Sequence, residues 1–159
     1  MKFIGSDNLQ YEINKVNNKS EFWHQILTII HSLWWDCDFK SMENSLTDVY
    51  SPDGLPETYA VTYKGELAGF CSLLRSDTLY RQDIFPWFGN CYVFEKFRHK
   101  GIMSKMQNYC CELAKQRGLS KIFLWTADKD LYIKCGWIYL EDILVNKKTT
   151  AHLFYKNIE

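Results

Sequence analysis

The sequence predicts an α/β (α+β) fold, in which one sheet carries helices on both of its faces. β-prone runs and segments of helical apolar periodicity are mixed along the chain in the order β-α-α-β-β-β-α-β-α-β-β, which is typical of such sheets. The 159 residues are 47% hydrophobic and 16% aromatic, enough to form one substantial core. Because we find no repeat, low-complexity tract or linker, we expect a single domain over residues 1–159.

Strands are expected where β-prone runs are bounded by turn residues. They are residues 9–16, 58–63, 66–74, 87–94, 121–126, 137–145 and 150–156. Helices are expected where apolar residues recur at helical spacing. Asn18 and Glu21 have the spacing of a capping box before the first helix, which runs to Trp34. The others are residues 39–50, 101–117 and 128–135, with Gly118 and Gly136 expected to end the last two. A turn is expected at residues 51–54 and a polar loop at residues 75–85.

Charge and composition argue against several classes of partner. The chain has 19 basic and 19 acidic residues and a net charge of +0, whereas proteins that bind nucleic acid usually have a basic excess. No apolar run is long enough to span a bilayer, and residues 1–10 lack the apolar core of a signal peptide. We therefore expect a cytoplasmic protein with no membrane partner. The six cysteines fit that compartment as reduced thiols, and their spacing does not match that of metal ligands.

A strand, a short basic loop and a helix start follow one another over residues 87–103. The first turn of a helix leaves amide N–H groups without intrahelical partners, and the positive end of the helix dipole adds to them. A pyrophosphate group fits such a place. Arg98 and Lys100 add positive charge, and Gly101 lets the backbone approach a phosphate closely. An ordinary strand-to-helix turn with a solvated basic loop would have the same composition.

The segment Arg98-His99-Lys100-Gly101-Ile102 resembles the coenzyme A signature R-x-x-G-x-G/A of the GNAT superfamily of N-acetyltransferases. One position departs from it, because Met103 stands where the family has its last glycine or alanine, so this side chain must point away from the pyrophosphate. Other segments resemble the family in the same order. They are residues 66–70 (second hairpin strand), 86–93 (fourth strand), 123–126 (fifth strand) and 131–137, which match the L-Y-x-K-x-G-F/W ending. The resemblance covers about residues 57–145.

The resemblance implies a single GNAT-type N-acetyltransferase domain, with a mixed, mostly antiparallel sheet that splays between its fourth and fifth strands near residues 89–90. It implies acetyl-CoA as co-substrate, with the pantetheine arm paired to the backbone at Tyr92 and Val93. Tyr132 matches the family's tyrosine near the sulfur, whose phenol can donate a hydrogen bond to the departing thiolate. The residues implied for the phosphates are Arg98, His99, Lys100, Gly101, Ile102, Met103 and Ser104.

The implied reaction is direct acetyl transfer to a primary amine of a small molecule or peptide. An amine with a pKa of about 10.4 is mostly protonated at pH 7, so a base would help. Asp83, just before the strand at 87–94, is the expected base, because that strand holds no carboxylate and Glu95 lies beside the phosphate loop.

Other readings of the sequence stay open. Cys91 could form a covalent intermediate, although no histidine lies near it in the sequence. A non-catalytic acyl-CoA-binding module of the same fold is the alternative function. The acceptor amine and the oligomeric state, a homodimer included, are not decided by the sequence.

Overall fold

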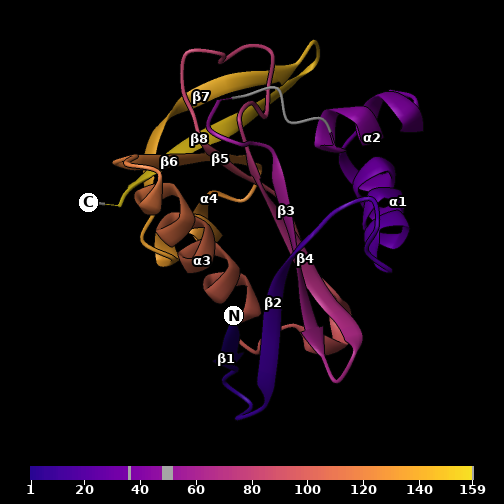
Figure 1. Ribbon diagram of the computed structural model, residues 1–159. Coiled ribbons are helices and arrows are strands. Elements are labelled where there is room, and N and C mark those ends of the chain that lie inside the picture. The colour runs from indigo at the N-terminus through magenta and orange to yellow at the C-terminus, as the bar shows by residue number, and fades with distance from the viewer. Residues whose placement is uncertain (36, 48–51, 159) are drawn as a thin grey trace. The chain divides into compact units, whose positions relative to one another are not determined.

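The computed structural model describes residues 1–35, 37–47 and 52–158, and Figure 1 labels its elements. The strands are β1 (Lys2–Ile4), β2 (Gln10–Val16), β3 (Glu57–Tyr63), β4 (Glu66–Leu74), β5 (Trp87–Val93), β6 (Lys121–Thr126), β7 (Ile138–Asn146) and β8 (Thr149–Asn157). The helices are α1 (Trp23–Trp34), α2 (Phe39–Thr47), α3 (Ile102–Gln116) and α4 (Lys129–Lys134), with a short 3₁₀ helix, η1 (Glu95–Phe97). The order of elements is the predicted one, with β1 added at the start.

The strands are hydrogen-bonded to one another in the order β1-β2-β3-β4-β5-β6-β8-β7. β5 and β6 run parallel, whereas the pairs β1–β2, β2–β3, β6–β8 and β7–β8 are antiparallel. This mixed, mostly antiparallel sheet with helices between its strands confirms the predicted fold class.

The described chain forms two compact units, each built from two separate segments. The first unit comprises residues 1–72 and 90–106, and the second comprises residues 73–89 and 107–159. Strands β4 and β5 and helix α3 each begin in one unit and end in the other. The backbone therefore passes between the units inside regular elements and not through linkers.

In the first unit, β1, β2 and β3 form an antiparallel sheet, in which Phe3 is opposite Tyr11 and Ile13 is opposite Val61. Tyr11, Ile13 and Val61 are fully buried. α1 has one apolar face, as its periodicity predicts. The buried residues of this face are Trp23, Ile26, Leu27 and Ile30. The sequence does not predict β1, because its three residues are too few to show an alternating pattern.

In the second unit, β6, β8 and β7 are neighbouring antiparallel strands (Figure 1). Leu124 in β6 is opposite Phe154 in β8, and Trp87 in β5 is opposite Phe123 in β6. Trp87 and Phe154 are among the largest side chains that are fully buried. Large aromatic residues therefore form much of this core, in agreement with the aromatic content of the sequence.

Most of the predicted turns and helix ends are confirmed. Lys64 and Gly65 have φ values of 49° and 80°, which suit the type I′ turn of the β3–β4 hairpin. Gly118 and Gly136 have φ values of 75° and 79° after α3 and α4, where the left-handed conformation ends a helix. Asp128 is the N-cap of α4, and its carboxylate accepts a hydrogen bond from a first-turn amide at 3.1 Å.

The predicted capping box before the first helix is wrong. Asn18 and Glu21 do not cap α1, because the helix begins after both of them, and its N-cap, Phe22, makes no side-chain capping bond. The side chains of Asn17 and Ser20 instead accept hydrogen bonds from main-chain N–H groups, at 2.9 and 3.0 Å. Such local bonds stabilise a turn that competes with the helix start.

The predicted helix at residues 39–50 is confirmed as α2 up to Thr47. Its last expected residues, 48–50, and Ser51 of the predicted turn lie outside the described residues. Among the residues that the structure describes, none of the helices is both long and apolar enough to cross a membrane.

Candidate functional site

In the first unit, the chain leaves β5, passes through η1 and a short loop, and enters α3. His99 and Gly101 have φ values of 61° and 76°, whereas Arg98 and Lys100 lie outside this left-handed region. Arg98 itself is extended, with φ −68° and ψ 162°, so these residues form a turn in which successive main-chain N–H groups can face one side, an arrangement that binds anions. The first-turn amides of α3 add donors at the positive end of the helix dipole. We call residues 98–104 the anion-binding loop.

Gly101 keeps this loop open. A Cβ added at Gly101 would meet no non-neighbouring atom of the described residues within 4 Å. Its φ of 76° is one that glycine adopts without strain and that other residues rarely adopt. An oxyanion can therefore approach the main chain here, and the loop fits the pyrophosphate group that the sequence leads us to expect.

The turn between β1 and β2 orients the loop from the other side. The Ser6 N–H donates to the Lys100 carbonyl at 3.0 Å, and the Ser6 hydroxyl donates to the His99 carbonyl at 3.3 Å. In a trans peptide the carbonyl and the following N–H point in opposite directions. The N–H groups of Lys100 and Gly101 are therefore directed away from this turn, as anion binding requires.

The positive charges of the loop are held in different ways. The Arg98 Nε–H donates to the Val93 carbonyl at 3.0 Å, and the guanidinium lies 5.9 Å from the centre of the Tyr92 ring. Its remaining N–H groups are on an exposed side chain. The Lys100 ammonium lies 3.4 Å from a carboxylate oxygen of Asp7, which partly neutralises it. Arg98 is therefore better suited than Lys100 to bind an anion.

Strand β5 departs from regular geometry at Asn90, close to where the family resemblance implies that the sheet splays. Asn90 has a φ of 48°, which is the left-handed conformation found at bulges within strands. Its side-chain amide donates to the buried Ser72 hydroxyl at 3.3 Å. Tyr92, further along the strand, stacks on Phe70 with ring centres 5.6 Å apart. These contacts fix the segment that leads into the anion-binding loop.

In the second unit, Tyr132 lies on α4 and is half-buried. Its ring makes an edge contact with Trp137 at 6.2 Å and a tilted contact with Phe154 at 6.5 Å. The Trp137 indole N–H donates to the Gln107 side-chain oxygen at 2.9 Å, and its ring lies 6.3 Å from Phe88 in β5. Tyr132 is thus connected through Trp137 to one face of β5.

The other face of β5 in this unit is occupied by Asp77. A Cβ added at Gly89 would lie 3.2 and 3.3 Å from the two carboxylate oxygens of Asp77, and 2.8 Å from a methyl carbon of Leu74. The Asp77 carboxylate therefore packs closely against the main chain at Gly89, and a larger residue here would require it to shift by a few tenths of an ångström. On the neighbouring strand, the Trp125 indole N–H donates to the main-chain carbonyl of Asp77 at 3.3 Å.

Asp77 has an unusual protonation equilibrium. Burial of the carboxylate among protein atoms disfavours its charged form and raises its pKa to about 7, although the indole of Trp125 acts in the opposite direction. The residue keeps part of its surface exposed. At neutral pH its carboxyl group can therefore both accept and release a proton.

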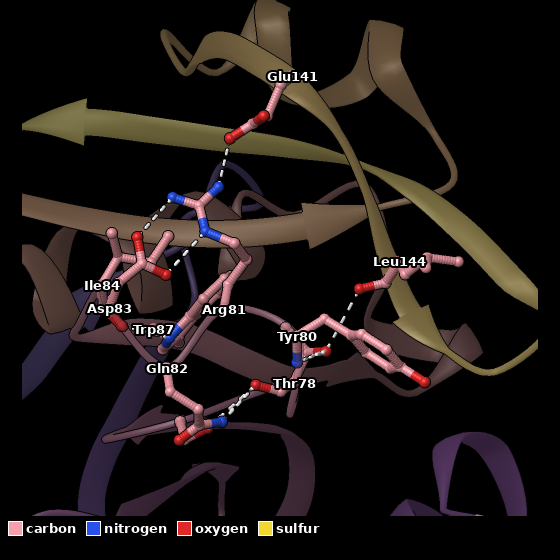
Figure 2. Close-up of polar contacts among 10 residues, drawn as sticks. Thr78, Tyr80, Arg81, Gln82, Asp83, Ile84, Trp87, Glu141 and Leu144 are labelled. Carbon is pink, nitrogen blue, oxygen red and sulfur yellow. Dashed lines mark hydrogen bonds and ion pairs between the residues drawn. The ribbon is translucent and has the colours of Figure 1, made fainter.

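The loop that carries Asp77 is anchored to β7, as Figure 2 shows. The Thr78 hydroxyl lies 3.4 and 3.2 Å from the carbonyl oxygens of Leu144 and Val145. The Gln82 amide donates to the Thr78 carbonyl at 2.6 Å. Arg81 forms ion pairs with Asp83 and Glu141, and so ties the end of the loop to the same strand.

Asp83, the predicted base, has an exposed carboxylate that accepts two hydrogen bonds from Arg81, at 2.9 and 3.0 Å (Figure 2). These bonds hold the pKa of Asp83 below its usual range. A low pKa makes a carboxylate a weaker base, so Asp77 has the more suitable chemistry of the two.

The family model described as "Acetyltransferase (GNAT) family" matches residues 23–137, which is more than half of the chain. The chain belongs to the GNAT acetyltransferase family. No curated protein sequence matches it significantly.

Solved structures share the fold of this acetyltransferase at low sequence identity. An aminoglycoside 6′-N-acetyltransferase complexed with coenzyme A is 15% identical, with a TM-score of 0.69 over 93% of this chain and 97% of that chain. The GNAT domain of S. lividans PAT is 9% identical, with a TM-score of 0.71 over 99% and 96%. A GNAT family acetyltransferase from Elizabethkingia anophelis with acetyl-CoA bound is 18% identical, with a TM-score of 0.64 over 92% and 97%. At these identities, the likeness shows the fold.

The sequence pattern of this acetyltransferase does not single out Asp77. The residue lies in a segment that was expected to be a polar loop, where an aspartate is ordinary. The available signal was Gly89, because a glycine inside a strand often marks the close approach of another group. Within the described part of the chain, no three His, Cys, Asp or Glu side chains gather where they could hold a metal ion.

Proposed function

We propose that this acetyltransferase moves the acetyl group of acetyl-CoA directly to a primary amine of a small molecule or peptide, and that both units make up one N-acetyltransferase domain. The observation that carries the proposal is the anion-binding loop, in which the left-handed His99 and Gly101 precede a helix start. The passage of β4, β5 and α3 from one unit to the other supports the single domain. Two structures that share the fold contain coenzyme A or acetyl-CoA, which supports the choice of donor.

In this proposal the cofactor is bound mainly by main-chain groups. The backbone at Tyr92 and Val93 would pair with the pantetheine arm, and the anion-binding loop would hold the phosphates. The N–H groups of Lys100 and Gly101 point away from the β1–β2 turn and are suitable donors, with Arg98 as the principal cation. Ile102, Met103 and Ser104 contribute first-turn amides of α3. His99 contributes its left-handed backbone rather than its ring.

Tyr132 would act on the leaving group in the second unit. Coenzyme A leaves as a thiolate whose thiol has a pKa of about 8.5, whereas tyrosine has a pKa of about 10, so full proton transfer is uphill by roughly 2 kcal/mol. The proposed role is a hydrogen bond from the phenol to the developing thiolate, which stabilises charge where it appears. The proton that completes the thiol comes from solvent.

The proposal is tested by binding and turnover together. Acetyl-CoA at 100 times its Kd should stabilise the folded protein by about 2.7 kcal/mol, which appears as an upward shift of Tm. A panel of primary amines, from polyamines and aminoglycosides to peptides, should then contain a substrate whose acetylation releases coenzyme A. The absence of both a Tm shift and calorimetric heat would refute the proposal. Binding without transfer to any amine would favour the non-catalytic acyl-CoA-binding module.

A further inference from the structure

Strands β5 and β6 have two faces in the second unit, and each face carries a different titratable group. Side chains alternate between faces along a strand, and residues directly opposite in a pair share a face. Trp87 and Gly89 therefore share one face with Phe123 and Trp125, because Trp87 is opposite Phe123. Asp77 contacts this face at Gly89 and Trp125.

Tyr132 belongs to the opposite face. Phe88 lies between Trp87 and Gly89 in β5 and points to the other side, where its ring lies 6.3 Å from Trp137. Leu124 and Phe154 are opposite one another on β6 and β8, and the Phe154 ring lies 6.5 Å from Tyr132. One carboxyl group and one phenol therefore approach the β5–β6 pair from opposite sides.

We propose that Asp77 is the general base of the reaction, which accepts a proton from the attacking amine on the face of the β5–β6 pair opposite to Tyr132. The inference rests on the proposed acetyl transfer and adds a catalytic residue to it. An acyl group at this strand pair would be attacked from the Asp77 side, while sulfur leaves toward the phenol side. Gly89 allows the carboxylate to lie close to the strand, because a Cβ at this position would be 3.2 and 3.3 Å from its two oxygens.

The proposed step is balanced in atoms and charge. The amine nitrogen forms a bond to the carbonyl carbon, and the carbon–sulfur bond breaks with its electron pair on sulfur. The proton lost by nitrogen goes to the Asp77 carboxylate, which returns it to solvent, and the thiolate takes a proton from solvent. Asp77 and Tyr132 therefore end each turnover in the protonation state in which they began.

The surroundings of Asp77 suit this role. Burial raises its pKa to about 7, so it is a stronger base than an ordinary aspartate and is largely ionised at slightly alkaline pH. The charged groups on its own loop are engaged elsewhere, because the Arg75 guanidinium lies over the Phe85 ring at 3.6 Å and Arg81 binds Asp83 and Glu141. β5 and β6 contribute the uncharged Gly89 and Trp125 at this point.

The test is Asp77→Asn, which removes the base and keeps the shape of the side chain. We expect kcat to fall about 10²- to 10⁴-fold, with the Tm shift caused by acetyl-CoA unchanged. In the wild-type enzyme, kcat/KM should fall on the acid side with a midpoint near 7, and the variant should lose this limb. The control is Asp142→Asn, which removes an exposed carboxylate bonded to His152 and should keep the acid limb.

Two outcomes separate this inference from the proposed function. Wild-type kcat and an intact acid limb in Asp77→Asn would overturn the role of Asp77 and leave acetyl transfer standing. A wild-type protein that neither binds acetyl-CoA nor acetylates an amine would refute the proposed function. The carboxyl titration of Asp77 can also be followed by NMR in the wild-type protein, without any activity assay. A midpoint in the ordinary aspartate range, well below 7, would overturn the inference.

Discussion

The anion-binding loop of the first unit and the proposed catalytic pair of the second are built in different ways. The loop is one continuous segment, and its donors are main-chain N–H groups fixed by left-handed residues and a helix start. The proposed catalytic pair consists of Asp77 and Tyr132, which are far apart in sequence and would act through their side chains. The loop depends on backbone conformation, whereas the protonation of Asp77 depends on burial. Variants should therefore affect the loop through shape and charge, and the pair through protonation.

The largest effect, on acetyl-CoA binding, is expected at the anion-binding loop. Gly101→Glu should abolish acetyl-CoA binding, because it forces a residue with a side chain into a φ of 76° and adds a negative charge where phosphates are proposed to lie. The Tm shift at saturating acetyl-CoA should disappear.

Gly118→Glu is a matched control for this variant. Gly118 has a φ of 75° and, like Gly101, an added Cβ there would meet no non-neighbouring atom of the described residues within 4 Å. It lies at the C-terminal end of α3, which does not attract anions. Both variants should lose similar stability, and only Gly101→Glu should lose binding. Equal acetyl-CoA affinity in the two variants would mean that the loop does not hold the phosphates.

The contrast explains how much could be predicted from the sequence. The β3–β4 hairpin, the two ends of α3 and the anion-binding loop depend on local signals, namely Lys64-Gly65, Gly101 and Gly118, and each of these glycines has a positive φ. Local signals also mislead where neighbours compete for the same groups. Asn17 and Ser20 bond to nearby N–H groups, and the capping box expected at Asn18 does not form.

The position of Asp77 could not be predicted in this way. Its neighbours Gly89 and Trp125 come from separate strands, and nothing in the residues beside it indicates burial. The sequence favours Asp83 as the base because it is close in sequence to β5, yet the structure pairs it with Arg81. Closeness in sequence to a strand does not decide which carboxylate is desolvated.

The second prediction concerns stability and does not need a substrate. The pKa of Asp77 is about 7 in the folded protein and 3.8 in its ordinary state, so the folded protein binds this proton more tightly than the unfolded chain. The free energy of unfolding should therefore decrease as the pH rises from about 4 to 7. Asp77→Asn removes the free-energy cost of holding an ionised carboxylate in the folded protein. It should therefore stabilise the protein at pH 8 by up to about 4 kcal/mol, and at pH 3.5 hardly at all.

Asp83→Asn should lower the free energy of unfolding at neutral pH, whereas Asp77→Asn should raise it. Arg81 lowers the pKa of Asp83, so its ionised form stabilises the fold at neutral pH and this contribution is lost as the pH falls through the folded pKa. Urea denaturation at pH 3.5, 6 and 8 measures both variants. A parallel loss of stability in both variants at pH 8 would show that the Asp77 carboxylate is not desolvated.

The smallest expected effect is at Tyr132, where one hydroxyl group is removed. Tyr132→Phe keeps the ring contacts to Trp137 and Phe154, so folding and acetyl-CoA affinity should change little. If the phenol stabilises the departing thiolate, kcat should fall about ten- to a thousandfold, which corresponds to about 1.4 to 4 kcal/mol.

Tyr139→Phe is the matched control, because its ring also contacts Phe154, at 5.7 Å, and its hydroxyl donates to the exposed Asp142. This control should turn over at the wild-type rate. Because Tyr132 is proposed to act on the leaving group and Asp77 on the nucleophile, the Tyr132→Phe enzyme should keep the acid limb that Asp77→Asn is expected to lose. Loss of acetyl-CoA binding with normal folding would instead make Tyr132 a cofactor-binding residue, and wild-type turnover would remove it from the mechanism.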